Sequence, residues 1–309
     1  MTTPILPDLR GRSLIPERMD DPALEPLLHA QALRGLARLN RFSRSASILW
    51  APIGQLASEA GKTPLRLLDL ATGAGDLPVE LWRRTRPFDS RHGLPSILLG
   101  TGWPWARSGF RPIPRPPASG SWPSDPERTR GTGVNRGATP PGRGGAPRAG
   151  LSLTVAGCDR SPVAIEQARA RARRAAAPIE FFVADALTDP LPSGYDILTC
   201  SLFLHHLSDD DAVTLLQRMA HAAQHLVLVN DLVRGVPGLA LAVVGTRFLS
   251  RSPVVHADGP QSVRAAYTIE EVCALASRAG LAGASVERRW PCRFLLSWRK
   301  VSDTFSSVG

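Results

Sequence analysis

Apolar residues follow two different periods along the chain. In residues 1–62 they recur at helical spacing, first after Asp21-Pro22 and again over 45–61. An aspartate followed by proline is a typical helix start, and the glycine at the end of the second segment is a typical helix end. Residues 1–62 therefore predict an N-terminal segment followed by a helical cap.

From residue 63 onward, short apolar runs alternate with helical segments. A chain in which strands alternate with helices forms a parallel sheet with helical crossovers. Strands are predicted at 65–70, 151–159, 179–185, 195–203 and 225–231. Helices are predicted between them, at 76–84, 161–174 and 208–223. The pattern indicates an α/β domain over 63–85 and 150–300.

The last part of the chain departs from this alternation. A helix over 268–279 is predicted by the capping box of Thr268 and Glu271. Two apolar runs follow, 284–290 and 292–300, with only a tight turn between them. Strands joined so closely must be antiparallel, so the sheet should end in an antiparallel hairpin.

Composition separates one segment from the rest of the chain. Residues 84–150 contain 12 Pro, 12 Gly, 11 Arg and three acidic residues, which gives them +8 of the +10 net charge of the chain. Such a composition cannot bury enough apolar surface to offset chain entropy, so 86–149 is expected to be a disordered insertion. Because the excess charge belongs to this segment, the basic net charge does not by itself indicate a nucleic-acid partner.

Cysteine usage and targeting signals narrow the cellular setting. The four cysteines are far apart and form no CxxC pair, which favours buried thiols in a reducing compartment over disulfides or a zinc site. The first residues lack the apolar core of a signal peptide, and the longest apolar run, 238–245, is too short to span a bilayer. We expect a cytoplasmic protein without a transmembrane segment.

The turn after the first predicted strand, within LLDLATGAGDLP (67–78), indicates a nucleoside site. It lacks the GxxxxGK of a triphosphate loop. Pro78 replaces the third glycine of a dinucleotide fingerprint, and Asp76 puts a negative charge where pyrophosphate would bind. S-adenosylmethionine has no phosphate and carries a positive sulfonium, so it tolerates these acids, and the two glycines allow the backbone to approach it.

The carboxylate partner of this turn lies far downstream. A nucleoside site of this kind needs a carboxylate at the end of the second strand to bind the ribose hydroxyls, normally about 20 residues on. Asp89 has that spacing, but no strand precedes it and no helix follows it. Asp159 has both, and removal of the biased segment would restore its expected distance from Asp69. Asp159 is therefore the preferred ribose ligand, and the insertion belongs to the loop between the first helix and the second strand.

Four segments in this order, LLDLATGAGD, GCDRSPVAIEQARARA, FFVADALTDPLP and YDILTCSLFLHHL, resemble the class I S-adenosylmethionine-dependent methyltransferases. The form DLATGAGD, with Ala71 in place of the first glycine, is most similar to small-molecule methyltransferases of ubiquinone and menaquinone biosynthesis. The resemblance implies a doubly wound α/β fold, with a mainly parallel seven-stranded Rossmann-like sheet, a C-terminal antiparallel hairpin and the N-terminal helical cap.

The resemblance also implies the residues that bind S-adenosylmethionine. These are Asp69, Ala71, Gly73 and Gly75 around the methionine moiety, Asp159 at the ribose, Asp185 and Ala186 at the adenine, and Ser201 and Leu202 under the reactive end. Arg160, next to Asp159, is also expected to bind the cofactor.

Two mechanisms are open for the predicted methyl transfer. Displacement at a sulfonium can draw most of its catalysis from positioning, and a base is needed only when the acceptor is a phenol, an enol or an acidic carbon. His205 and His206 follow the fourth strand and are candidate bases, although they can equally shape the pocket. His221 and His225 have i, i+4 spacing without the frame of a metalloprotease site, so no metal is predicted.

The long connection 232–267 is predicted to be a substrate lid. It begins at the carboxyl end of a central strand, where open α/β sheets bind ligands, and should form an apolar helix over 236–249 followed by a loop. The candidate substrate residues are Asp231, Arg247, Arg251 and His256. An apolar wall with a few cations suits an aromatic or lipid-like acceptor with an anionic group. Equally, the helix can be part of the core and the arginines can be solvated.

These features predict an O- or C-methyltransferase that acts on a small, apolar or aromatic metabolite. The fourth strand reads SLFL rather than a [DN]PP[YF]-like motif, so nucleic acid is not expected as a substrate. The alternatives are an RNA or protein methyltransferase that uses the Arg-rich insertion, a non-catalytic cofactor-binding module, and a peripheral membrane protein that uses the 236–249 helix. The sequence does not indicate an oligomeric state.

Overall fold

The computed structural model describes residues 9–21, 23–42, 44–60, 64–86 and 151–300. The predicted insertion 86–149 lies outside these residues, apart from Arg86.

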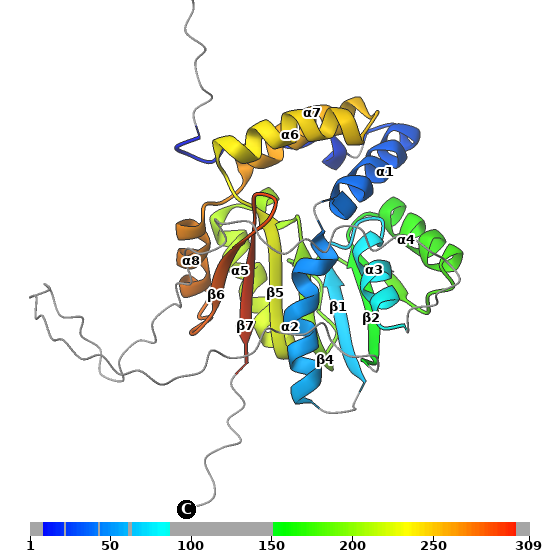
Figure 1. Cartoon of the computed structure of the whole chain (residues 1–309), viewed down its shortest axis with the longest axis vertical. Helices are drawn as coiled ribbons and strands as arrows, with labels where there is room; N and C mark the ends of the chain where they lie inside the picture. Colours follow the sequence, from blue (N-terminus) through cyan, green and yellow to red (C-terminus); the bar gives the residue numbers. More distant parts are fainter. Residues whose placement is uncertain (1–8, 22, 43, 61–63, 87–150, 301–309) are drawn as a thin grey trace, which may run out of the picture.

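The sheet has seven strands in the order β3-β2-β1-β4-β5-β7-β6 (Figure 1). All neighbours up to β5 pair in parallel, whereas β7 is antiparallel to both β5 and β6. The strands are β1 (Leu65–Leu70), β2 (Leu153–Asp159), β3 (Glu180–Val183), β4 (Tyr195–Ser201), β5 (Ala223–Leu232), β6 (Ser285–Arg289) and β7 (Arg293–Arg299). The mainly parallel sheet with a C-terminal antiparallel hairpin is therefore confirmed.

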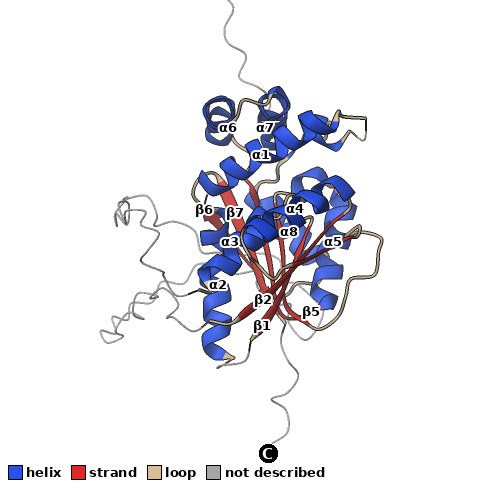
Figure 2. Cartoon of the chain, turned by 90° about the vertical axis from the view of Figure 1, so that its right-hand side faces the viewer, coloured by secondary structure: helices blue, strands red, loops and turns tan. Residues whose placement is uncertain are grey.

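Helices cover both faces of this sheet (Figure 2). On one face lie α2 (Ser45–Glu59), α3 (Asp76–Arg84) and α4 (Pro162–Arg174). On the other lie α5 (Asp209–Ala222) and α8 (Ile269–Arg278). The strands supply buried side chains in both directions, since Leu67 packs with α2 and α3 whereas Leu68 packs with α5 and α8. Strands buried on both faces explain the almost continuous apolar runs of the sequence.

A third layer of short helices lies across the carboxyl ends of the parallel strands (Figure 1). It consists of η1 (Arg18–Asp20), α1 (Pro26–Phe42), α6 (Val236–Leu249) and α7 (Pro253–Ala265). We call these four elements the cap. The amino-terminal segment and the long connection after β5 thus meet at the same end of the sheet, with α7 packed against both η1 and α1.

Side-chain caps begin three of the helices that pack on the sheet. The side chain of Ser161 accepts a hydrogen bond from the N–H of Ala164 at the start of α4, and Ser208 caps α5 in the same way. The capping box of Thr268 and Glu271 is present at the start of α8.

Two expectations about the cap were wrong. The helix α1 begins at Pro26 rather than at Pro22, because Asp21 Oδ1 accepts the N–H of Ala23 in a local turn. The residues after α6 form the helix α7 rather than a loop. Gly259-Pro260 lies within this helix, which is stabilised by burial of Val255 and other residues along one of its faces.

Gly75 gives a stability prediction for the fold. It has a φ of +69°, and a Cβ there would lie 2.8 Å from Phe181 Cζ and 2.9 Å from Ala168 Cβ. The Gly75→Ala substitution should lower the free energy of unfolding by about 2–4 kcal/mol, through a left-handed backbone penalty and overpacking, measured by urea denaturation. Gly283 is the matched control, because it has a φ of +79° but no atom within 4 Å of the added Cβ. Gly283→Ala should cost only about 1–2 kcal/mol, and equal losses in the two variants would contradict the packing argument.

Candidate functional site

The site begins at the turn between β1 and α3, where the strand order reverses direction. Ala71, Gly73 and Gly75 all have positive φ values, of 49°, 55° and 69°. This left-handed path is available to glycine without strain and explains why two glycines stand there. Open α/β sheets bind ligands at such a switch point, which here lies between β1 and β4.

Asp159, at the end of β2, fixes this turn through its carboxylate. Its Oδ2 accepts the N–H of Gly73 at 2.8 Å, and its Oδ1 accepts the N–H of Ser161 at 2.9 Å. The structure thus brings Asp159 against the glycine turn, although 86 positions separate Asp159 from Gly73 in the sequence.

Asp69 lies beneath the same turn and is 2% exposed. Its two carboxylate oxygens accept hydrogen bonds from Thr199 Oγ1 at 2.6 Å and Thr72 Oγ1 at 2.8 Å. Burial raises the pKa of Asp69 to about 7, despite these two hydrogen bonds. Asp69 therefore positions the turn and the neighbouring strand β4, and it does not line the cavity described next.

A cavity of about 840 Å³ lies between the carboxyl ends of the strands and the cap. On the sheet side it is lined by the following expected cofactor residues: Ala71, Gly73, Asp159, Arg160, Asp185, Ala186, Ser201 and Leu202. On the cap side it is lined largely by apolar side chains, among them Leu24, Leu33, Leu36, Leu39, Leu241, Leu249 and Val255. One cavity therefore joins a polar, acidic half to an apolar half.

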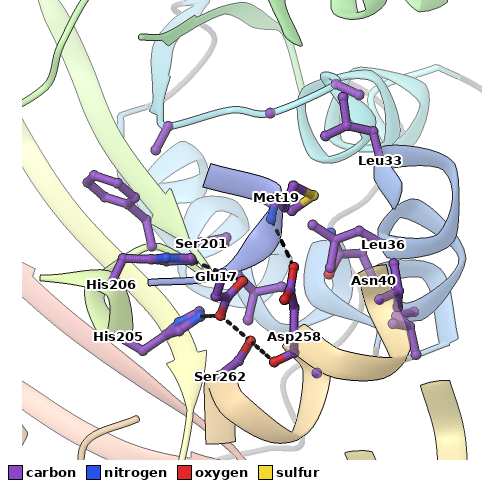
Figure 3. A pocket seen from close by; sticks show the side chains of 18 of the residues that line it. Glu17, Met19, Leu33, Leu36, Asn40, Ser201, His205, His206, Asp258 and Ser262 are labelled. Atoms are coloured by element: carbon purple, nitrogen blue, oxygen red, sulfur yellow. Dashed lines mark hydrogen bonds and ion pairs between the residues drawn. The ribbon is translucent and has the colours of Figure 1, made fainter. Parts of the chain in front are cut away.

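Glu17 joins these two halves (Figure 3). His205 Nδ1 lies 2.7 Å from Asp231 Oδ1, and His205 Nε2 lies 3.5 Å from Glu17 Oε1. All three side chains are buried. Burial disfavours the charged imidazolium, but the two carboxylates outweigh it and raise the pKa of His205 to about 10. The pKa values of Asp231 and Glu17 are lowered, in spite of burial, by the same histidine.

Two residues of α7 hold Glu17 in place. Ser262 Oγ donates to Glu17 Oε1, and the carboxylate of Asp258 accepts the N–H groups of Arg18 and Met19 at 3.0 Å each. Sequence reasoning missed Glu17, Asp258 and Ser262, since none belongs to a motif. The sequence could have pointed to them only through their position, since Glu17 lies in the N-terminal segment and the other two lie in the predicted lid 232–267.

His206 lies beside Glu17, and both side chains line the cavity. Its Nε2 is 3.9 Å from Glu17 Oε2, and its ring is stacked near that of His205. Ligand atoms of Glu17, His205 and His206 lie within 4.8 Å of one another, a spacing that could also hold a metal ion. We interpret the cluster as an acid–base network, because both ring nitrogens of His205 face buried carboxylates, those of Asp231 and Glu17.

None of the four candidate substrate residues lines the cavity. Asp231 is 1% exposed and is bound to His205 and to the N–H of Leu232. Arg247, Arg251 and His256 are not among the residues that line the cavity. Arg247 Nη1 donates to Val243 O of its own helix, and His256 Nε2 bonds to Ser250 O.

A different arginine reaches the cavity instead. Arg293, at the start of β7, is 4% exposed, and its guanidinium donates to Ser45 Oγ at 3.1 Å and Asn40 Oδ1 at 3.5 Å. Burial lowers the pKa of Arg293 to about 10, which still leaves it charged at neutral pH.

The polar half of the cavity fits a nucleoside with a positive rather than a negative end. Asp76 occupies the first turn of α3 and lines the cavity, so a carboxylate stands where a phosphate would bind. A Cβ at Gly73 would meet no atom within 4 Å, which leaves the turn open to close approach by a ligand. With Asp159 and Asp185 also lining it, this half favours a cation.

Comparison with known sequences agrees with this geometry. A family model described as a methyltransferase domain matches residues 142–225. This range contains β2, β3, β4 and the residues from Asp159 to His206. No curated protein sequence matches the chain.

Solved structures with the same fold are methyltransferases of low sequence identity. An O-methyltransferase family 2 protein from Planctomyces limnophilus, in complex with apigenin, has a TM-score of 0.51 at 15% identity and covers 91% of this chain and 63% of its own. A putative O-methyltransferase from Nostoc punctiforme has a TM-score of 0.51 at 15% identity and covers 94% of this chain and 64% of its own. The chain thus spans just under two thirds of each.

A third structure, magnesium protoporphyrin IX methyltransferase from Synechocystis with bound S-adenosylhomocysteine, has a TM-score of 0.46 at 12% identity and covers 92% of both chains. The matched methyltransferase-domain model, the seven-stranded sheet with its reversed strand and the glycine turn paired with Asp159 agree with one another. Residues 142–225 thus match a methyltransferase domain, in a chain that has the fold of solved methyltransferases.

Proposed function

We propose that the protein methylates a hydroxyl group, or an acidic carbon, of a small and mainly apolar acceptor that binds under the cap. The observation that carries this proposal is the single cavity in which an acidic half on the sheet meets an apolar half on the cap, with Glu17 and His206 at the junction. The closer similarity of DLATGAGD to quinone-biosynthesis enzymes remains a prediction about sequence similarity and does not identify the acceptor.

In the proposed site, the sheet residues hold the cofactor. Asp159 and Arg160 bind the ribose, Asp185 and Ala186 the adenine, and the turn around Gly73 the methionine moiety. Asp69 and Gly75 act through the turn, because neither lines the cavity. When bound, S-adenosylmethionine supplies the electrophilic methyl group of its sulfonium.

Ser201 and Leu202, at the end of β4, face the place where the acceptor meets the cofactor. Leu202 has a φ of 56°, and its N–H donates to Asn230 O, so this corner is firmly held. The apolar cap wall excludes water from the acceptor and orients it, which is the positioning that a displacement reaction needs.

His206 and Glu17 together are suited to take a proton from the acceptor. His206 lines the cavity, and Glu17 would stabilise the imidazolium that forms when His206 accepts a proton. His205 is a poor base because it already carries a proton at neutral pH. Its role is to hold Glu17 through one nitrogen while Asp231 fixes the other.

The test is turnover of S-adenosylmethionine to S-adenosylhomocysteine with a panel of phenols of increasing alkyl-chain length. Formation of a methyl ether, identified by mass spectrometry, supports the proposal. Cofactor binding without turnover of any phenol or of a metabolite extract would favour the non-catalytic module. Turnover that requires RNA or protein would favour the alternative that uses the Arg-rich insertion, which lies outside the described residues.

Asp159 gives a prediction about cofactor binding. The Asp159→Ala variant loses a carboxylate at the ribose and the support of the Gly73 N–H, so the Kd for S-adenosylhomocysteine should rise about 100-fold in calorimetry. Asp196→Ala is the matched control, because Asp196 Oδ2 accepts the N–H of Arg66 at 2.7 Å at the other end of the sheet. Unchanged affinity in Asp159→Ala would remove the assignment of this residue.

The acid–base pair gives a prediction about turnover. His206→Gln and Glu17→Gln should each lower kcat with a phenol by about 100-fold or more, because the acceptor proton loses its base or the stabilising carboxylate. The Kd for S-adenosylhomocysteine should change little. His221→Gln, on the exposed side of α5, serves as the control histidine. If His206→Gln retains full kcat across the pH range, the histidine only shapes the pocket.

The buried His205 predicts how stability depends on pH. Its ordinary pKa is 6.5 and its pKa in the folded protein is about 10, so the folded state binds more protons than the unfolded state between these values. The resulting stabilisation is complete below about pH 6.5 and is lost as the pH rises through 10. Urea denaturation at pH 7 and pH 9.5 should show the decrease, and NMR of the imidazole nitrogens should show both nitrogens protonated at pH 8. A neutral imidazole at pH 8 would contradict the prediction.

A further inference from the structure

The outer face of α6 is apolar and exposed. This face consists of seven exposed residues, Val236, Pro237, Ala240, Val243, Val244, Arg247 and Phe248. All of them except Arg247 have apolar side chains. Phe248 is 85% exposed, and Val236 and Val244 are each about half exposed. A helix that is apolar on all sides is normally buried on all sides. In the part of the chain that the structure describes, only the opposite face of the helix is covered.

The opposite face of α6 forms part of the cavity wall. Gly238, Leu241, Ala242, Gly245 and Leu249 all line the cavity, and of these Leu241 is also exposed. The exposed apolar face and the apolar acceptor half of the cavity are therefore separated by the thickness of one helix. This helix lies at the outer edge of the cap (Figures 1 and 2).

Basic side chains flank the exposed face, and acidic ones are missing from the helices that form it. Arg247 and Arg251 are exposed at the carboxyl end of α6. Arg38 of α1 is also exposed and donates from Nε to Leu249 O, which places a third guanidinium at the same end. Neither α1 nor α6 contains an aspartate or a glutamate.

We propose that the outer face of α6 docks on the surface of a membrane that contains anionic lipids. Phe248 and the valines enter the boundary between headgroups and acyl chains, and the three arginines contact anionic headgroups. This combination of an apolar face, an exposed aromatic side chain and flanking cations is the physical description of a helix that lies in the plane of a membrane surface. No helix among the described residues is long and apolar enough to cross a bilayer, so docking is peripheral.

A second copy of the chain fits this face less well. In a two-fold dimer the same patch meets itself, so the interface would contain the arginines of both copies. Neither α1 nor α6 contains an acidic residue that could pair with them. A membrane surface offers the opposite charge and also a source of apolar acceptors next to the cavity. The docking itself does not depend on which acceptor is methylated.

The experiment is flotation of the full chain with vesicles. We expect it to float with vesicles of phosphatidylcholine and phosphatidylglycerol, to float less with phosphatidylcholine alone, and to be released in part by high salt. Phe248→Ser and Val244→Ser should each weaken partitioning, about tenfold for the phenylalanine. Arg247→Glu should weaken binding to the anionic vesicles by about tenfold or more, because the charge is reversed.

Matched controls separate docking from general effects. Val183→Ser changes a valine that is 52% exposed on the edge strand β3, and Arg174→Glu changes an exposed arginine of α4. Both should leave flotation unchanged. Calorimetry with S-adenosylhomocysteine should give the same Kd for Phe248→Ser as for the unsubstituted chain, which shows that the variant is folded.

Three results would overturn the proposal. The first is no flotation with any vesicle composition. The second is flotation that Phe248→Ser and Val244→Ser leave unchanged. The third is a dimer in solution that Phe248→Ser converts to a monomer, without binding to vesicles, which would make the face an interface between copies of the chain.

Discussion

A buried, charged histidine between two carboxylates connects the cap to the sheet. Asp231 belongs to β5, His205 follows β4, and Glu17 comes from the N-terminal segment, which α7 holds through Ser262. Removal of one partner from a buried ion pair typically costs about 3–5 kcal/mol, because it leaves an uncompensated charge. The position of the cap, and with it the shape of the acceptor half of the cavity, depends on this network.

The cofactor half depends on a different constraint, the reversal of strand order between β1 and β4. It places the glycine turn and the end of β4 side by side, with Asp159 of β2 next to the turn. Both halves meet at Glu17, so the proposed base lies where the proposed cofactor and acceptor sites join. The exposed face of α6 extends the apolar character of the acceptor half to the surface of the protein.

Local signals predicted the sheet and its helices closely. The strand Leu65–Leu70 and the helix Asp76–Arg84 have the bounds expected from the sequence, because each coincides with a complete apolar or capping pattern. The pairing of Asp159 with the turn could be inferred across a long insertion, since a strand precedes it and a capped helix follows. The helix α7 could not be inferred from the sequence, because Gly259-Pro260 is a pair that locally disfavours a helix. Burial of α7 against η1 and α1 outweighs this local preference.

The sequence by itself determined the order of strands and helices, the glycine turn and its carboxylate partner, since these follow from periodicity and from residues close to strand ends. Only the tertiary structure decided which residues of the two cap segments meet over the sheet. It brought Glu17 to His205 and placed Arg293 in the cavity wall, whereas Arg247 and Arg251 do not line the cavity. The physical reason is that contacts between distant segments depend on how helices pack, and packing leaves no periodic signal in the sequence.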